Sequence, residues 1–546
     1  EHIVLPHTES RMVPSKLLAL GLLAVNGQWD ARLESTFNAV LFAGMAVLIA
    51  LALVRVFGAE FRIPIFVTAG AYGALPYAWE NTIWGFQLSF YCLIFFSLLT
   101  IWGLGLNRAF SAGWFVGAIA AIIAPVSMAA GFVAIVAVLG VETLRLLTKR
   151  RTLRASAPTL LACAATLALA LYFRVYIPEH EPYRAPSLAV WAQVATKFLG
   201  WPFEVSSGFL LAYLPLAFLL LRYVRRARAS EEANFAQQAE TLFLLGALSV
   251  LLAAGIAYAR AMLSPGATAS RYMDALAPGF LANVLAVFVF LRQANPRKLL
   301  ASAWLGCAVF ALVLLVHKEL GRLKAKAEKF ASAEQAVRAY IASGDISVLP
   351  DTPPNGIPYP DRGMLASFVD DPVLRQILPA SLRPPLELVA EEGMDVFARQ
   401  GVGEHAWTSD PAVVGDARGT MTTQLLEPTL PYLQVELFGR PGPGMQLMLK
   451  DENSEDSVTF RTFKRDDGWR VGLMRVPGRK VRLVARDDNA AEAFAFREPR
   501  EIGRWSVYAE RLLLRAPRVL ALGLALAVSL LALASVRGRS AAGDTA

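Results

Sequence analysis

Long apolar stretches separated by short polar connections fill the first three fifths of the chain. A stretch of roughly 17–25 apolar residues is long enough to cross a bilayer as a helix. Pro125 and Gly131 leave open whether the fourth and fifth stretches are two spans or one broken hairpin. About 11 transmembrane helices are therefore predicted: Thr36–Val56, Ile63–Trp79, Ile83–Gly105, Ser111–Val126, Ala129–Leu147, Pro158–Tyr176, Ser206–Leu221, Thr241–Arg260, Ala275–Leu291, Leu299–Val316 and Val519–Val536.

Lys and Arg residues gather in every second connection between these stretches. Because positively charged connections stay in the cytoplasm, the alternate connections are predicted to lie outside, and the C-terminus is predicted to be cytoplasmic. The chain then starts outside, which predicts a first helix upstream of Glu1. The positive connections are those containing Arg55 and Arg62, Arg108, Lys149 to Arg154, Arg222 to Arg228, Arg292 to Lys298, and Arg537 and Arg539.

Five segments lie on the predicted outer face: Glu1–Ser35, Glu80–Thr82, Ile177–Glu204, Ala261–Asp274 and His317–Arg515. The two longest regions are Glu1–Ser35 and His317–Arg515. The first contains Ser15–Val25, which is apolar but too short to span; Pro14 before it and the turn Asn26-Gly27-Gln28 after it predict a helix lying in the membrane interface. The second region contains a helical stretch, Gly321–Ser343, and a Pro-rich connector, Leu349–Pro385. Alternating apolar residues then predict a β-sandwich-like domain, which resembles the jelly-roll, carbohydrate-binding-like domains of some membrane enzymes.

Within that domain, the strands around Leu433–Leu437 and Met445–Leu449 are predicted to form a hairpin across Gly439–Gly444, and Asp466-Asp467-Gly468 to form a second turn. The expected fold is mainly α, a polytopic membrane protein with an extracytoplasmic β domain. Its predicted parts are 1–35, an outer loop with the interfacial helix; 36–316, the transmembrane catalytic domain; 317–386, the connector; 387–515, the β domain; and 516–546, the last helix and tail.

Composition agrees with a membrane protein: 55% of the residues are hydrophobic and 18% are charged, whereas soluble proteins carry about 25% charged residues. The net charge of +9 does not indicate nucleic-acid binding, because the basic residues follow topology and form no basic face. Cys92, Cys163 and Cys307 lie in apolar stretches without metal-ligand spacing, so we interpret them as small buried hydrophobes.

Ionisable residues predicted at the outer rim are the candidates for chemistry, since few are expected within the spans. Glu1 and His2 could supply a general base, with a solvated loop pair as the plainer interpretation. Glu80 and Asn81 could contact substrate, or Glu80 could stabilise a helix N-terminus. Arg271-Tyr272, with Arg260 as a second candidate, could bind either a substrate phosphate or a lipid headgroup. His180 is expected in a solvated loop.

The stretches Asn26–Glu34, Glu80–Tyr91 and Ser270–Pro278 resemble uncharacterised bacterial members of the GT-C superfamily of multi-spanning glycosyltransferases. The resemblance covers residues 1–316 and implies transfer of a sugar from a polyprenyl-phosphate donor to a glycan, lipid or protein acceptor on the outer face of the bacterial inner membrane. It implies that Glu1 matches the catalytic carboxylate, with Glu9 and Asp30 as alternatives, and that Arg271 contacts the donor phosphate. It also implies that a divalent cation is a candidate cofactor.

Two other functions are also compatible with the sequence. A transporter or flippase of lipid-linked sugars would place charged residues deep within the spans. A non-catalytic, membrane-anchored glycan-binding or assembly protein would account for the β domain, but it would not need so many spans. Convergence of Glu1, Glu80 and Arg271 on one outward cavity that opens to the lipid would favour the transferase, and scattered positions would favour the other two functions.

Overall fold

The computed structural model describes residues 3–7, 9–205, 207–225, 233–263, 269–291, 297–350, 361–400, 406–415, 418–438, 444–452, 457–459, 461–464, 469–488, 495–523 and 525. The chain divides into two compact units. Unit 1 comprises the described residues of Glu1–Ala19 and Ser35–Leu323, and unit 2 comprises those of Leu20–Glu34 and Lys324–Leu526. Each unit is described by itself.

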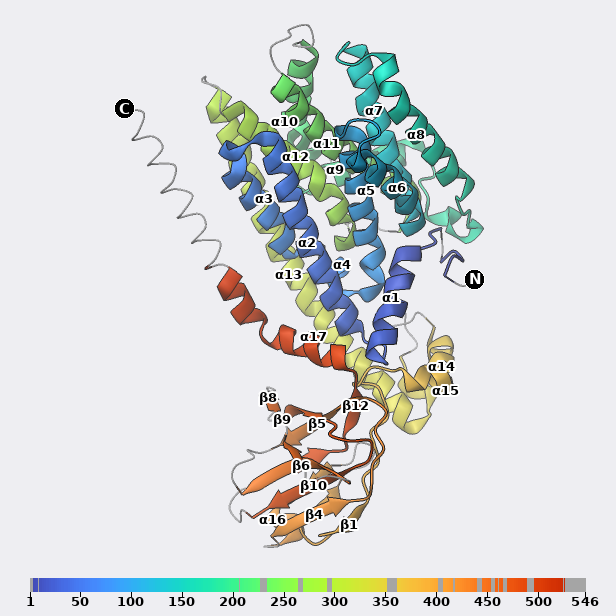
Figure 1. Cartoon of the computed structure of the whole chain (residues 1–546), viewed down its shortest axis with the longest axis vertical. Coiled ribbons are helices and arrows are strands. Elements are labelled where there is room, and N and C mark those ends of the chain that lie inside the picture. Colours follow the sequence, from blue (N-terminus) through green and yellow to red (C-terminus); the bar gives the residue numbers. More distant parts are fainter. Residues whose placement is uncertain are drawn as a thin grey trace, which may run out of the picture. The chain divides into compact units, whose positions relative to one another are not determined.

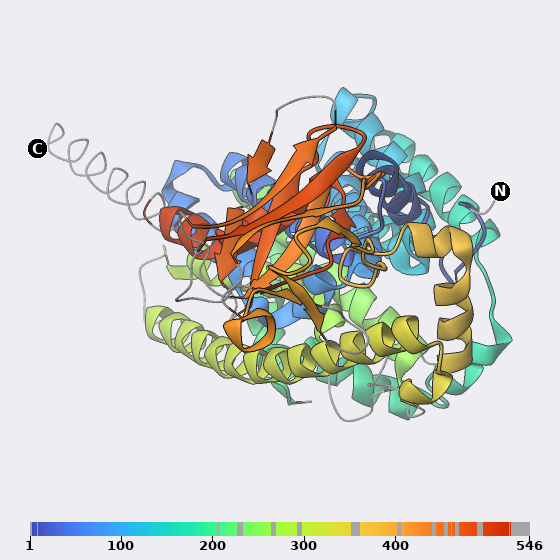
Figure 2. The same cartoon turned by 90° about the horizontal axis from the view of Figure 1, so that it is seen from below.

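Unit 1 is built from helices (Figure 1). Three described helices continue across its boundary, α1 (Val13–Asn26), α2 (Ala31–Phe57) and α13 (Arg297–Ser343), and Figure 2 shows α13 as one uninterrupted helix. The others are α3 (Arg62–Ala74), α4 (Trp79–Ile83), α5 (Leu88–Leu106), α6 (Ala112–Ser127), α7 (Val133–Leu147), α8 (Leu153–Tyr172), α9 (Leu188–Leu199), α10 (Gly208–Arg225), α11 (Ala233–Arg260) and α12 (Met273–Leu291). Short 3₁₀ segments join them: η1 (Ala59–Phe61), η2 (Pro76–Ala78), η3 (Gly85–Gln87), η4 (Ala129–Phe132), η5 (Pro178–Tyr183) and η6 (Ser270–Tyr272).

Eight described helices are long and apolar enough to cross a membrane, so the chain is a membrane protein. They correspond to eight of the predicted spans, with bounds Ala31–Phe57, Gly85–Leu106, Ala129–Leu147, Leu153–Tyr172, Gly208–Arg225, Asn234–Arg260, Ser270–Leu291 and Lys298–Ser343. Most of the predicted span Val519–Val536 lies outside the described residues.

Two predicted spans form shorter helices than expected. The stretch Ile63–Trp79 is interrupted because Pro76 holds the preceding Leu75 in an extended conformation (φ −78°, ψ 131°), which ends α3 after 13 residues. The stretch Ser111–Val126 gives α6, with 16 residues. Met128 is also extended (φ −146°, ψ 148°) and separates α6 from η4 and α7. The Pro125 and Gly131 region therefore contains two separate helices.

Helix packing in unit 1 is closest between α5 and α6. A Cβ built at Gly117 would lie 2.6 Å from Gly103 Cα, so only glycine lets the two backbones approach this closely. Small residues at helix interfaces are a common device in membranes, where lipid tails remove the hydrophobic drive for association. Helix α11 packs against α12, α9 and α7 and contributes Leu242, Leu248 and Leu252 to the buried core.

Unit 2 contains two antiparallel sheets (Figure 1), with strand orders β1-β4-β10-β6-β7 and β2-β3-β11-β5-β9-β8, and with β12 paired to β5. Their apolar residues form one shared core that includes Leu433, Leu447, Leu483 and Phe496. The strands are β1 (Ala390–Glu392), β2 (Ala398–Gln400), β3 (Ala406–Thr408), β4 (Gly419–Thr423), β5 (Tyr432–Phe438), β6 (Met445–Asp451), β7 (Ser457–Thr459), β8 (Arg461–Lys464), β9 (Trp469–Arg475), β10 (Val481–Asp487), β11 (Ala495–Arg497) and β12 (Arg500–Ile502).

The predicted hairpin between β5 and β6 is wrong, although the strands themselves are present. β5 pairs with β9, β11 and β12, whereas β6 pairs with β10 and β7 in the other sheet. Alternating apolar residues determine which face of a strand is buried, but they do not determine its partner strand. β8 and β9 do pair antiparallel, as the second turn predicted; residues 465–468 between them lie outside the described residues.

Unit 2 also contains the 3₁₀ segment η7 (Ile346–Val348) and the helices α14 (Arg362–Asp370), α15 (Pro372–Gln376), α16 (Pro411–Val414) and α17 (Arg504–Leu514). The predicted turn at Asn26 to Gln28 docks onto the start of α17. Asn26 Oδ1 accepts hydrogen bonds from Trp505 N (3.0 Å) and Ser506 N (3.1 Å), so a distant residue caps this helix. Gln28 Oε1 likewise accepts from Gly503 N at 3.1 Å.

Candidate functional site

Glu9, Arg260 and His180 form an ionic cluster in unit 1, hereafter the Glu9 cluster. Arg260, at the C-terminus of α11, donates from Nη1 and Nη2 to the two carboxylate oxygens of Glu9 at 2.9 and 2.6 Å. His180 Nδ1, in η5, lies 2.6 Å from Glu9 Oε1. Three segments far apart in sequence therefore meet at one carboxylate.

The charge on Glu9 is strongly favoured by this arrangement. Burial alone would raise the pKa of Glu9, but the hydrogen bonds from Arg260 and His180 and the Arg260 charge outweigh it and lower the pKa to about 2. A carboxylate with so low a pKa is a weak proton acceptor at neutral pH. Glu9 is thus suited to holding Arg260 and His180 in place rather than to accepting a proton.

Glu80, Ser270 and Arg271 form a second cluster, hereafter the Arg271 cluster. Glu80 Oε2 accepts hydrogen bonds from Ser270 Oγ (2.9 Å) and Arg271 N (3.0 Å). Glu80 Oε1 lies 3.6 Å from Arg271 Nη1, and the Arg271 side chain remains 28% exposed. Glu80 therefore fixes the backbone of η6 and leaves the Arg271 guanidinium accessible.

Tyr272 connects the two clusters. The guanidinium carbon of Arg271 lies 5.0 Å from the centre of the Tyr272 ring, within the range of a cation–π contact. The Tyr272 side chain also interacts with Arg260, and its ring packs near Phe90 and Phe198. Two arginines thus converge on one aromatic side chain where α11 ends and η6 leads into α12.

Asn81 lies beneath the Arg271 cluster and is fully buried. Its Nδ2 donates to Arg271 O (2.8 Å) and to Asp274 Oδ2 (2.9 Å). Asn38 Nδ2, on α2, donates to Asn81 O at 3.2 Å. Asn81 therefore supports the Arg271 backbone from within the protein, away from any position that a large substrate could reach.

The structure brings together five of the predicted site residues: Glu80, Asn81, Arg260, Arg271 and Tyr272. Glu1 and His2 lie outside the described residues. The expectation of a solvated loop at His180 is wrong, because the side chain is held against Glu9. This contact could not be predicted from sequence, because His180 and Glu9 lie far apart in the chain.

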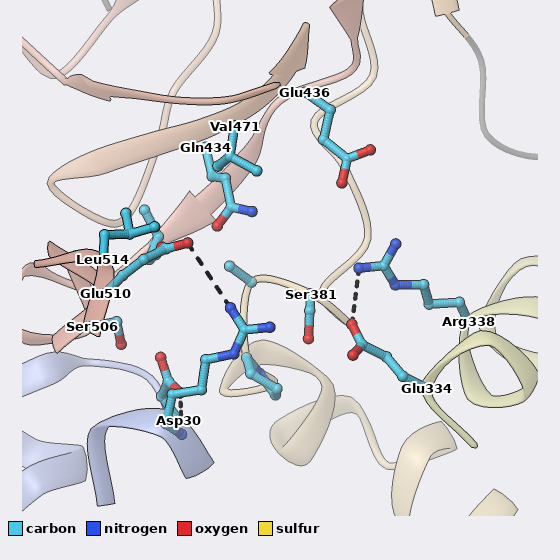
Figure 3. A pocket seen from close by; sticks show the side chains of 14 residues that line it. Asp30, Glu334, Arg338, Ser381, Gln434, Glu436, Val471, Ser506, Glu510 and Leu514 are labelled. Atoms are coloured by element: carbon cyan, nitrogen blue, oxygen red, sulfur yellow. Dashed lines mark hydrogen bonds and ion pairs between the residues drawn. The ribbon is translucent and has the colours of Figure 1, made fainter. Parts of the chain in front are cut away.

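Asp30, the other alternative for the catalytic carboxylate, belongs to unit 2 and caps α2. Its Oδ1 accepts hydrogen bonds from Arg32 N (2.8 Å) and Leu33 N (3.4 Å). Asp30 also lines a polar cavity of about 250 Å³. Figure 3 shows Glu334 and Arg338 of α13 paired along this cavity, with Glu436 of β5 and Glu510 of α17 also labelled around it.

A third ionic cluster lies at the other end of unit 1. Arg145 of α7 binds Glu142 and also Glu240 of α11, at 2.7 Å for the latter, and Glu240 accepts from Tyr223 Oη at 2.6 Å. Glu240 and Arg260 are 20 positions apart on α11, which corresponds to about 30 Å along a helix. These ionisable groups lie near the ends of candidate spans, and their pairing makes their burial tolerable.

No protein-family model, curated protein or solved structure matches the chain. The site is therefore interpreted from its own chemistry. One end of the apolar helical bundle holds the guanidinium groups of Arg260 and Arg271, the carboxylate of Glu80 and the aromatic ring of Tyr272. The described residues contain no group of three or more His, Cys, Asp or Glu side chains arranged to hold a metal ion.

Proposed function

We propose that this chain is an integral membrane glycosyltransferase that moves a sugar from a polyprenyl-phosphate donor to an acceptor on the outer face of the membrane. The observation that supports this most directly is Arg271, which is partly exposed, stacked on Tyr272 and adjacent to Glu80. A guanidinium can donate paired N–H groups to a phosphate, and a lipid-linked phosphate would arrive at the end of a membrane helix.

In the proposed reaction, a carboxylate removes the proton of the acceptor hydroxyl, and the acceptor oxygen attacks the anomeric carbon of the sugar. The bond from that carbon to the phosphate oxygen breaks, and the configuration is inverted. Arg271 stabilises the negative charge that develops on the departing phosphate. Among the described carboxylates near Arg271, Glu80 is the better base, because Glu9 is held by Arg260; Glu1 remains the base implied by the GT-C resemblance.

The test uses the full-length chain in lipid vesicles, supplied with polyprenyl phosphates that carry radiolabelled hexoses. Sugar transfer to extracted glycan or lipid acceptors is measured. Arg271→Ala is expected to lower the transfer rate about 10²-fold or more, the usual effect of losing one transition-state donor. Glu80→Gln is expected to lower it by about 10²–10⁴-fold, as for loss of a general base.

Lys318→Ala is the matched control, because Lys318 forms a surface ion pair with Glu204, with Nζ 2.6 Å from Oε2. Such pairs contribute little, so transfer should be unchanged. Equal transfer by wild type and Arg271→Ala would refute the role of Arg271. Glu1→Gln tests the competing base: if it abolishes transfer while Glu80→Gln does not, the base is Glu1.

A flippase of lipid-linked sugars is the second candidate function. The observation in its favour is the buried cluster of Glu142, Arg145 and Glu240 within candidate spans, since transporters often carry charged residues there. The same vesicles separate the two functions. Movement of labelled donor across the bilayer without transfer of its sugar would favour the flippase over the transferase.

A further inference from the structure

Asp274, in the first turn of α12, is fully buried and forms no ion pair with a Lys or Arg side chain among the described residues. Its single hydrogen-bond donor among the described residues is Asn81 Nδ2, at 2.9 Å. Arg271, three residues earlier in the chain, pairs with Glu80 instead. The other buried carboxylates described in unit 1 all have an arginine partner: Glu142 and Glu240 bind Arg145, and Glu319 binds Arg322.

An unpaired carboxylate is costly in this environment. Transferring a charge out of water into an apolar interior carries a penalty of several kcal/mol after relaxation, and a charge within a membrane span is rarely left without a partner. The carboxylate of Asp274 therefore requires either a proton or a bound cation.

Two buried amides are connected to Asp274 through hydrogen bonds, because Asn81 Nδ2 donates to Asp274 Oδ2 and Asn38 Nδ2 donates to Asn81 O. Asp274 Oδ1, Asn81 Oδ1 and Asn38 Oδ1 receive no hydrogen bond from the described residues. Both amide NH₂ groups already donate, that of Asn81 to Asp274 Oδ2 and that of Asn38 to Asn81 O and Trp84 O. Rotating either amide would set oxygen against oxygen, so each Oδ1 is fixed as an acceptor.

We propose that Asp274, Asn81 and Asn38 bind a monovalent metal cation of the sodium type. A proton on Asp274 Oδ1 would neutralise the carboxylate and could be donated to one amide oxygen, which would leave the other amide oxygen without a partner among the described residues. A cation can be coordinated by several oxygens at once. Oxygen ligands suit hard cations. One carboxylate neutralises a single positive charge, whereas a divalent ion would leave a buried net charge. The proposal does not depend on sugar transfer.

The cation would join three separate elements, α2, α4 and α12, directly below the Arg271 cluster. Asn81 is the connection, because its Nδ2 also donates to Arg271 O at 2.8 Å. The buried hydroxyl of Tyr72, which has no hydrogen-bond partner among the described residues, is a fourth oxygen within electrostatic range of Asp274. Cation binding would thus stabilise the backbone that presents Arg271.

The test measures sodium binding and thermal stability of the purified full-length chain in detergent. Binding of radioactive sodium is measured directly, and the unfolding temperature is measured in sodium chloride and in choline chloride at equal ionic strength. We expect saturable binding and a sodium-dependent rise in unfolding temperature for wild type. Asp274→Asn should abolish both sodium effects, and Asn81→Ala should weaken the apparent affinity about 10-fold or more, as for other residues that support a metal site.

Asn283→Ala is the matched control. Asn283 lies on the same helix and is equally buried, but its Oδ1 accepts from Leu216 N and its Nδ2 donates to Gly279 O. This variant should lower stability and keep the sodium-dependent rise. The wild-type measurement alone can overturn the proposal. Three results would each refute it: the absence of both sodium binding and a sodium-dependent rise in unfolding temperature, a response of that temperature to pH alone, or stabilisation by magnesium or calcium in place of sodium.

Discussion

Replacing Glu9 by Gln tests the ionic cluster that holds the end of α11. Glu9 has an ordinary pKa of 4.5 and a pKa of about 2 in the folded chain. At about 1.4 kcal/mol per pKa unit, this difference corresponds to roughly 3 kcal/mol of stabilisation. Solvent reaches the cluster, since the side chains of Glu9 and Arg260 are 19% and 23% exposed, so we expect about 1–2 kcal/mol after screening.

The sign of the pH dependence follows from the lowered pKa. The folded state binds the Glu9 proton more weakly than the unfolded state, so the stabilisation is fully present above pH 4.5 and is lost as the pH falls toward 2. The assay is thermal unfolding of purified wild type and Glu9→Gln at a series of pH values. The wild type should be more stable at neutral pH, and the difference should shrink through this window.

Comparing the two proteins at each pH removes the contribution of other carboxylates that titrate in acid. Arg260→Gln provides a second test, because a double-mutant cycle with Glu9→Gln isolates the energy of the pair. A stability difference that stays constant from neutral pH to about pH 3 would refute the reasoning, as would additive effects in the cycle.

Three further predictions concern the interior of unit 1. Arg145→Met leaves Glu142 and Glu240 buried without their shared arginine and should lower the free energy of unfolding in urea by about 3–5 kcal/mol. The Arg151 side chain is 31% exposed, so Arg151→Met should lower it by less than about 1 kcal/mol. Gly117→Ala places a Cβ 2.6 Å from Gly103 Cα and should lower the unfolding temperature, whereas Gly140→Ala, with no atom within 4 Å, should not; equal shifts would contradict the close approach of α5 and α6. Trp79→Phe removes the donor at 2.9 Å to buried Glu319 Oε2 and should cost about 1–3 kcal/mol; an unchanged unfolding midpoint would contradict that bond.

The membrane helices were the part of the fold most accessible from sequence. Length and apolarity identified the spans, as at Ala129–Leu147, whose observed bounds match the prediction. The break at Leu75 was missed because the apolar run continues through Pro76, although the proline disfavours helix at the residue before it. In the β domain, residue alternation located β5 and β6 but could not assign their partners, because pairing depends on tertiary contacts.

The candidate site was accessible only in part. Arg271 and Glu80 were accessible as candidates because both flank apolar stretches on the predicted outer face, and the structure places the two side chains together. The pairing of Arg260 with Glu9 and His180 could not be predicted, since these residues come from three segments whose proximity depends on the packed bundle. The burial of Asp274 without a cationic partner among the described residues could not be predicted either, because acidic residues are common in the first turn of a helix.

Helix α11 is anchored at both ends by ion pairs, to Arg145 near one end and to Glu9 at the other. A rocking motion that opened the bundle alternately to each side would have to break one of these anchors in every cycle, at a cost of several kcal/mol for the buried pair. We therefore expect α11 to stay in place while other helices move. The proposed lipid-linked donor would then reach Arg271 by lateral diffusion along the bilayer, without passing through the bundle.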